Sequence, residues 1–182
     1  MRHWSRHQAG RAISRLVDIL GPKAGKQVPD KGTAPPSEHA EGKAIDAPWD
    51  VLDRAYFNGY ALWTYLTSPF HFVMPGCSVE EIGPWREGGE LWPGVRVMYP
   101  SDIASHSRKQ DFYFGPDFLL RRHEYHVEAS RGFAVAQYVF DPVTVQGITL
   151  PTKRRAYMRD DRLAPMHDRL MVSIKLSGIV LS

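Results

Sequence analysis

From residue 95 onward, apolar and polar side chains alternate with a period of two, as in half-buried strands. Short stretches rich in Gly, Pro, Asp and Ser separate these runs and are typical of turns. The predicted strands are VRVMY (95–99), SRKQDFYF (107–114), LLRRHEYHV (119–127), FAVAQYVF (133–140), ITLPTKRRAYM (148–158) and LMVSIKLSGIVL (170–181). Because the connections are short, we expect about six strands in a consecutive antiparallel meander.

Between residues 48 and 67 the period changes to that of a helix, which Asp46 or Ala47 could cap and Pro69 would end. Its predicted buried stripe is Leu52, Tyr56, Gly59, Trp63 and Leu66. Further aromatic residues lie off this stripe, which indicates contact with more than one surface, and Gly59 suggests a close backbone approach. The predicted class is α+β: a curved antiparallel sheet, an incomplete barrel, wrapped around one aromatic-rich helix.

The first 47 residues differ in composition from the rest of the chain. Residues 9–20 place their apolar side chains on one helical stripe with arginines opposite, whereas residues 21–47 are rich in Gly, Pro, Lys and Glu, as in a disordered linker. We therefore divide the chain into a basic, loosely helical and flexible tail (1–47) and a folded domain (48–182). Residues 2–20 could bind an anionic membrane surface, but so short a helix is marginal alone.

Charge and composition exclude several classes of protein. The formal charge is +3, but the excess lies in residues 1–26, and residues 27–182 hold more acidic than basic residues, which argues against a nucleic-acid partner. No apolar run approaches about 18 residues and no secretory signal is evident. A single cysteine, Cys77, excludes an internal disulfide, so we expect a cytoplasmic protein. Nucleotide-binding motifs are absent, and no cofactor is predicted.

Hydrogen-bonding side chains recur at every second position of the hairpin at 106–126. If Phe114 pairs with Leu119 across the turn, Gln110 lies opposite His123. One face then carries His106, Arg108, Gln110, Phe112, Phe114, Arg121, His123 and Tyr125. A slip of one residue in the pairing would put Arg122, Glu124 and His126 on this face in place of Arg121, His123 and Tyr125. The sequence leaves the register open.

Two interpretations of this face compete: a solvated sheet surface, or the polar groups of a ligand cavity between helix and sheet. For the second, the predicted ligand-binding residues are Tyr60, Trp63, His106, Gln110, Phe112, His123, Tyr125 and Arg154. His106 or His123 could also act as an acid or base near neutral pH. An inward arginine could bind a ligand carboxylate or phosphate, or pair with Glu124 or Glu128. Histidine spacing does not favour a metal site.

Six motifs in order resemble a group of uncharacterised, mostly actinobacterial proteins. They are GYALWTYLTSPF (59–70), EEIGPWREGGELW (80–92), IASHSRKQDFYF (103–114), LLRRHEY (119–125), GITLPTKRRAYM (147–158) and MVSIKLS (171–177). The architecture of this group is similar to that of the lipoprotein carriers LolA and LolB. The resemblance implies a half-barrel around a helix with an apolar cavity between them, although not lipoprotein transport, since fold does not fix function.

The leading functional hypothesis is a soluble binding protein that holds a small hydrophobic or amphipathic molecule between helix and sheet. One alternative is a cofactor-independent enzyme that uses His106 or His123 on a small metabolite. Another is a membrane-surface module tethered by residues 2–20. The resembling proteins carry further strands before the helix, whereas residues 1–46 do not read as strands. An incomplete sheet of this kind would leave an open edge, which favours a homodimer.

Overall fold

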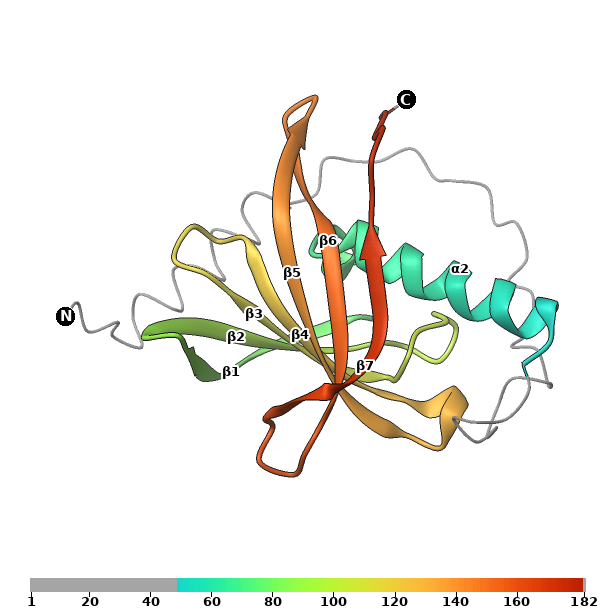
Figure 1. Ribbon diagram of the computed structural model, residues 1–182. Helices are drawn as coiled ribbons and strands as arrows, with labels where there is room; N and C mark the ends of the chain where they lie inside the picture. Colours follow the sequence, from blue (N-terminus) through green and yellow to red (C-terminus); the bar gives the residue numbers. More distant parts are fainter. Residues whose placement is uncertain (1–48, 182) are drawn as a thin grey trace.

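An antiparallel meander and one long helix make up residues 49–181, the part of the chain that this structure, a computed structural model, describes. The elements are α2 (Val51–Thr67), η1 (Phe70–Val73), β1 (Ser78–Glu87), β2 (Glu90–Met98), β3 (Lys109–Phe114), β4 (Leu120–Val127), η2 (Glu128–Ser130), β5 (Phe133–Val145), β6 (Ile148–Arg159) and β7 (Pro165–Lys175). All seven strands form one sheet in sequence order (Figure 1). The predicted α+β class and the meander are confirmed, with seven strands where about six were expected.

The predicted N-terminal helix at 9–20 and the linker at 21–47 lie outside the described residues. Binding of residues 2–20 to a membrane surface therefore stays a prediction. Within residues 49–181, no helix combines the length and the apolar character needed to cross a bilayer.

The strand that the sequence did not reveal is β1, at one edge of the sheet. Its Gly83-Pro84 step interrupts the alternation, and the pairing with β2 shifts between Ile82 and Trp85. Proline is tolerated there because an edge strand has a side with no ladder hydrogen bonds. The opposite edge is β7, and pairing of two copies through such an edge stays a prediction.

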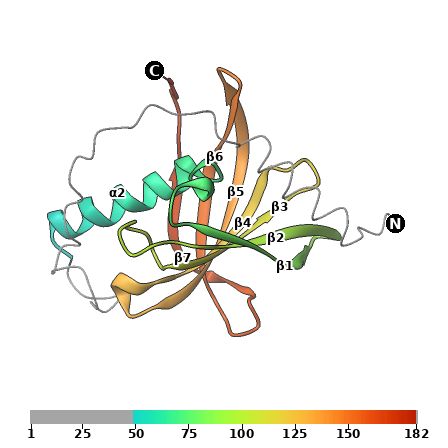
Figure 2. The ribbon, with the colours of Figure 1, turned by 180° about the vertical axis from the view of Figure 1, so that it is seen from behind.

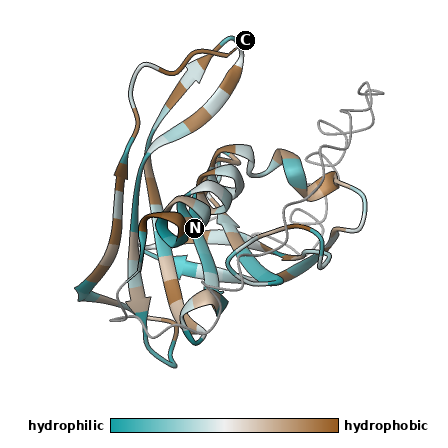
Figure 3. Cartoon of the chain, turned by 90° about the vertical axis from the view of Figure 1, so that its right-hand side faces the viewer, coloured by the Kyte–Doolittle hydropathy of each residue, from teal (hydrophilic) through white to brown (hydrophobic). Residues whose placement is uncertain are grey.

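The sheet is strongly twisted, as antiparallel sheets with long strands tend to be. In Figure 1, β1 and β2 run across the view while β5, β6 and β7 run up it, and Figure 3 shows the sheet bending around α2. The hairpin of β5 and β6 extends beyond its neighbours, which is also visible from behind (Figure 2). We call the sheet face toward α2 the concave face and the other the convex face.

A reciprocal capping box starts α2. The Asp53 backbone N–H donates to Oδ1 of Asp50 at 2.8 Å, and the Asp50 N–H donates to Oδ2 of Asp53 at 3.1 Å. This arrangement satisfies two N–H groups that the first helical turn leaves without partners. The helix therefore begins at Val51, and the predicted caps Asp46 and Ala47 are wrong.

The buried face of α2 is also different from the predicted stripe. Asp53, Ala61, Thr64 and Tyr65 are its buried residues, with Phe57 and Tyr60 packed beside them. The predicted stripe faces outward, and its Leu52, Trp63 and Leu66 are 76%, 36% and 38% exposed. Two polar residues on the buried face hid the true stripe, because a pattern of apolar spacing does not count them.

Three clusters of buried side chains fill the two faces. Between α2 and the concave face lie Ala61, Tyr65, Tyr125, Val127, Val135 and Ala156. Further along the same face lie Phe72, Val95, Val97, Tyr99, Phe112 and Phe114. On the convex face a smaller cluster contains Trp92, Tyr113, Ala136 and Tyr138. The central strands are therefore covered on both faces.

Replacement of Gly59 by alanine should stabilise the protein. The expected close backbone approach at Gly59 is wrong, since a Cβ there would meet nothing within 4 Å. Without a clash, Gly59→Ala should raise the free energy of unfolding by up to about 1 kcal/mol. Urea denaturation of both proteins measures this change.

The matched control is Gly94→Ala in β2, where a Cβ would lie 2.7 Å from Cε1 of Tyr113 and 2.8 Å from Cγ1 of Ile82. This variant should lose stability. A loss of stability in Gly59→Ala would mean that the exposed face of α2 has a packing partner.

Candidate functional site

The hairpin of β3 and β4 has a register two residues away from the predicted one. Phe112, rather than Gln110, lies opposite His123. Phe114 pairs with Leu120 instead of the predicted Leu119, and an irregularity between Tyr113 and Phe114 adds the second residue of the shift. Because a shift of two residues leaves each side chain on its original face, the predicted face is retained.

Both faces of β4 are buried, which excludes a solvated sheet surface at this hairpin. His123 and Tyr125 face α2 and are 1% and 3% exposed. Arg122 and Glu124 lie on the convex face and are 0% and 4% exposed. Arg108 was predicted to share the concave face, but its side chain is exposed. Its Nε donates a hydrogen bond to the carbonyl of Tyr99, the residue that follows β2.

Seven hydrogen-bonding side chains form a closed set between α2 and the concave face, which we call the interior network. No member is more than 3% exposed. The members are Tyr65 from α2, His106 from the loop before β3, Gln110 from β3, His123 and Tyr125 from β4, Gln137 from β5 and Arg154 from β6. Residues from five elements therefore meet in an interior that excludes solvent.

One branch of the interior network has a defined direction. Nη1 of Arg154 donates to Oε1 of Gln137 at 2.9 Å, so the amide nitrogen of Gln137 is the atom that faces the Tyr125 hydroxyl, at 3.5 Å. The Tyr125 hydroxyl lies 2.8 Å from that of Tyr65, which lies 2.7 Å from Nε2 of His106. If each hydroxyl donates once, Tyr125 donates to Tyr65 and Tyr65 to Nε2 of His106. The donor atoms of this branch that no acceptor reaches are then Nδ1 of His106 and Nε of Arg154.

The other branch fixes the tautomer of His123. The amide nitrogen of Gln110 donates to the Ser107 carbonyl at 2.9 Å, so Oε1 of Gln110 accepts from Nε2 of His123 at 2.6 Å. The His123 ring stacks on Phe112 with ring centroids 4.1 Å apart. Its Nδ1 then carries a lone pair that is buried without a donor.

Burial holds the histidines of this region in the neutral form. It lowers the pKa of His106 to about 3 and that of His71 to about 4, and it holds the pKa of His123 well below its ordinary value. An imidazolium with a pKa near 3 is almost unpopulated at neutral pH. This arrangement therefore gives no support to either histidine as a proton shuttle near neutrality.

Arg154 is the one cation of the interior network. Burial lowers its pKa to about 10, which leaves it charged at neutral pH. Within residues 49–181, no carboxylate lies within 4 Å of its guanidinium, and its Nε has no hydrogen-bond partner. Nη2 donates to the Tyr65 carbonyl. That carbonyl would normally accept from the residue four positions on, which is Pro69 and has no N–H.

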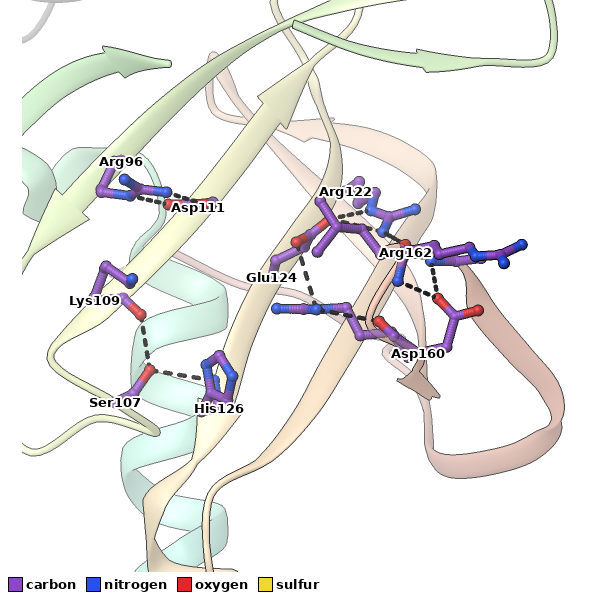
Figure 4. A network of polar contacts seen from close by, with 12 residues as sticks. Arg96, Ser107, Lys109, Asp111, Arg122, Glu124, His126, Asp160 and Arg162 are labelled. Atoms are coloured by element: carbon purple, nitrogen blue, oxygen red, sulfur yellow. Dashed lines mark hydrogen bonds and ion pairs between the residues drawn. The ribbon is translucent and has the colours of Figure 1, made fainter. Parts of the chain in front are cut away.

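Arg122 on the convex face is the opposite case (Figure 4). Its guanidinium lies 2.6 Å from Oε1 of Glu124. It also donates to the Tyr138 hydroxyl at 2.6 Å and lies over the ring of Trp85, 3.9 Å from the ring centroid. It also donates to the Leu163 carbonyl in the loop between β6 and β7. The predicted pairing of a buried arginine with Glu124 is confirmed, but for Arg122 and not for Arg154.

A cavity lies at one end of the concave face, beyond the interior network. It has a volume of about 300 Å³ and opens between the C-terminal end of α2, the β3–β4 turn and the base of the β5–β6 hairpin. It is lined by Ser68, Pro69, Phe114, Phe118, Leu119, Leu120, Arg121, Val139, Phe140, Asp141, Pro142, Thr149 and Pro151. We call it the end pocket. None of the eight predicted ligand-binding residues lines it.

Those eight residues fall into two groups. Six of them lie together in the interior: His106, Gln110, Phe112, His123, Tyr125 and Arg154. Tyr60 is half-buried, with its ring centroid 5.2 Å from that of His106. Trp63 is 36% exposed and its ring lies against His71, away from the others. In residues 49–181, no three His, Cys, Asp or Glu side chains group to hold a metal ion.

The sequence did contain one signal of the end pocket. Three consecutive apolar residues, Phe118, Leu119 and Leu120, follow directly after Gly115-Pro116-Asp117, although turns are ordinarily polar. In the structure, Phe118 has a φ of 63°, which is unusual for a large aromatic residue. The other walls come from β5 and β6, and their meeting depends on the tertiary fold.

Removal of the Tyr65 hydroxyl should cost about 1–3 kcal/mol of unfolding free energy. Tyr65→Phe leaves Nε2 of His106 without its donor and Tyr125 without its acceptor, in an interior that excludes water. Urea denaturation gives the loss. Tyr157→Phe is the control, because the Tyr157 hydroxyl has no hydrogen bond with the described residues. Equal effects in the two variants would contradict the interior network.

The free energy of unfolding should fall between about pH 7 and pH 5. Unfolded histidines bind protons below a pKa of about 6.5, whereas His71, His106 and His123 stay neutral in the fold, so acid favours the unfolded chain. Burial raises the pKa of Glu124, so the folded chain binds a proton there more readily than the unfolded chain and acid favours the fold at this site. This is one group against three histidines. We expect a fall of at least about 2 kcal/mol.

Denaturation at a series of pH values measures this slope. His106→Gln removes one of the three buried histidines and should therefore reduce the slope. A flat profile in the native chain would mean that the buried histidines titrate as they do in the unfolded state.

No model of a known protein family matches this chain, and neither the curated proteins nor the solved structures contain a match. The comparisons therefore do not identify the group that the motifs resemble. The structure confirms the architectural part of that expectation for residues 49–181, which form one open antiparallel sheet of seven strands with one α-helix against it.

Proposed function

We propose that this chain binds a small, largely apolar molecule in the end pocket. The observation that carries this proposal is the cavity of about 300 Å³ with a mostly apolar lining. Its volume is at the lower limit of the roughly 300–1,000 Å³ that small-molecule sites occupy. The half-barrel architecture implied by the resemblance to lipoprotein carriers agrees with such a role.

The position of the pocket differs from the site that the sequence suggested, between the helix and the middle of the sheet. There the interior network occupies the space with its own side chains, each below 4% exposed. At the end of the concave face, Pro69 and Ser68 end the helical cover, while β5 and β6 continue past it. The uncovered strands supply the wall for a guest.

The lining has the composition of a site for an amphipathic molecule. Phe114, Leu120 and Val139 form an apolar floor on β3, β4 and β5. Polar side chains are few, and two of them are Arg121 and Thr149. Burial of an apolar group against such walls contributes about 25 cal/mol per Å² of surface removed from water.

A tryptophan at Thr149 should block the end pocket. Thr149→Trp places a bulky ring in the wall of the cavity and should weaken binding of a neutral apolar fluorescent probe, N-phenyl-naphthylamine, by about tenfold or more. Thr144→Trp is a matched control: Thr144 pairs with Thr149 across the strands and shares its hydroxyl hydrogen bond of 2.9 Å, but does not line the pocket.

Fluorescence titration gives the affinity of each variant, and urea denaturation shows that both remain folded. Unchanged binding in Thr149→Trp would overturn the proposal for this pocket, as would failure of the native chain to bind the probe. Equal loss in both variants would place the probe on the exposed hairpin instead.

A further inference from the structure

We propose that the guest of the end pocket is a carboxylate with an apolar tail, and that Arg154 binds its anionic head. This inference rests on the proposed function and names the chemical class of the ligand. The geometry points to it because, among residues 49–181, the Arg154 guanidinium has no carboxylate partner, and Arg154 lies directly across the sheet from Val139, which lines the apolar cavity.

The charge of Arg154 is compensated only in part by the protein. A buried ion is costly unless it is paired, and folded proteins almost always supply a partner. Here the guanidinium has the Tyr65 carbonyl at the C-terminal end of α2 and the amide oxygen of Gln137. A helix C-terminus carries roughly half a negative charge. The remaining charge and the free Nε–H can be satisfied by an anion.

The protein pairs its other fully buried arginine in the ordinary way. Arg122 has Glu124 at 2.6 Å, and Glu87 at 3.6 Å. Both arginines belong to adjacent Arg-Arg pairs in strands, and both are 2% exposed or less. The difference between them therefore does not follow from burial or from strand position. It distinguishes a structural ion pair from a cation that is available to a ligand.

Arg154 adjoins the end pocket from the sheet and from the helix. On the sheet, it is the direct cross-strand partner of Val139, which lines the pocket. Side chains of directly opposed residues have Cβ atoms about 4.5–5.5 Å apart. On the helix, the guanidinium binds the Tyr65 carbonyl, and Ser68, one turn further on, also lines the pocket. Displacement of the Val139 side chain would bring a ligand head to the guanidinium.

A carboxylate suits this site because guanidinium and carboxylate are planar and bind through two parallel hydrogen bonds. Nε and one terminal nitrogen of Arg154 can form this fork if Nη2 or Nη1 changes its acceptor. The apolar tail would remain in the cavity between Phe114 and Leu120. Arg121 at the pocket is a weaker candidate for the head, since Asp117 already neutralises it at 2.5 Å.

The test compares octanoate with octanol, which has the same tail and no charge, by titration calorimetry of the full chain at neutral pH. Octanoate should bind at least about tenfold more tightly. Arg154→Met should abolish this preference while octanol still binds, and Arg121→Gln should retain it. Equal binding of both probes by the native chain would overturn the inference but leave the proposed function in place. Binding of neither would overturn the proposed function.

A second readout separates ligand binding from a purely structural role. Arg154→Met leaves the Tyr65 carbonyl and Oε1 of Gln137 without a donor, so the ligand-free variant should have a lower urea midpoint than the native chain. Octanoate should raise the urea midpoint of the native chain more than that of Arg154→Met. An equal rise in the two proteins would assign Arg154 to the support of α2 alone, and loss of octanoate preference in Arg121→Gln would assign the head to Arg121.

Discussion

The contact between Arg154 and the carbonyl of Tyr65 is the constraint on which the interior of this protein depends. Pro69 leaves that carbonyl without its helical donor, and the guanidinium of β6 supplies one. The same guanidinium orients the amide of Gln137, whose nitrogen faces the Tyr125 hydroxyl. The position of α2 on the sheet and the direction of the hydrogen bonds are thus coupled through one side chain.

This coupling explains why protein side chains fill the space between α2 and the middle of the sheet. A helix that rests on a polar network is stabilised where the buried donors meet acceptors, because each unmet group in such an interior costs about 1–3 kcal/mol. The hydroxyls of Tyr65 and Tyr125 bond to each other, and these tyrosines stay neutral because burial raises the pKa of both. The space that might have been a cavity is filled by the groups that were expected to line it.

The sequence predicted the parts of the fold that depend on local periodicity. The alternation after residue 95 identified six of the seven strands, and the parity of the β3–β4 hairpin placed Gln110, His123 and Tyr125 on one face. The register was not predictable, since it depends on the irregularity at Tyr113 and Phe114.

Other features required the tertiary structure. The buried face of α2 includes Asp53, whose burial follows from the capping box, and Thr64, whose hydroxyl donates to the Tyr60 carbonyl. No apolar pattern records such residues. The end pocket joins a helix end, a turn and a hairpin that are far apart in the sequence, so its walls meet only when the strands have paired.

Arg154 was predicted to bind a ligand because of its position in a strand. Its distinctive property, however, is that no carboxylate among residues 49–181 pairs with its guanidinium. That property depends on which face Glu124 occupies, and Glu124 lies on the convex face, beyond the sheet.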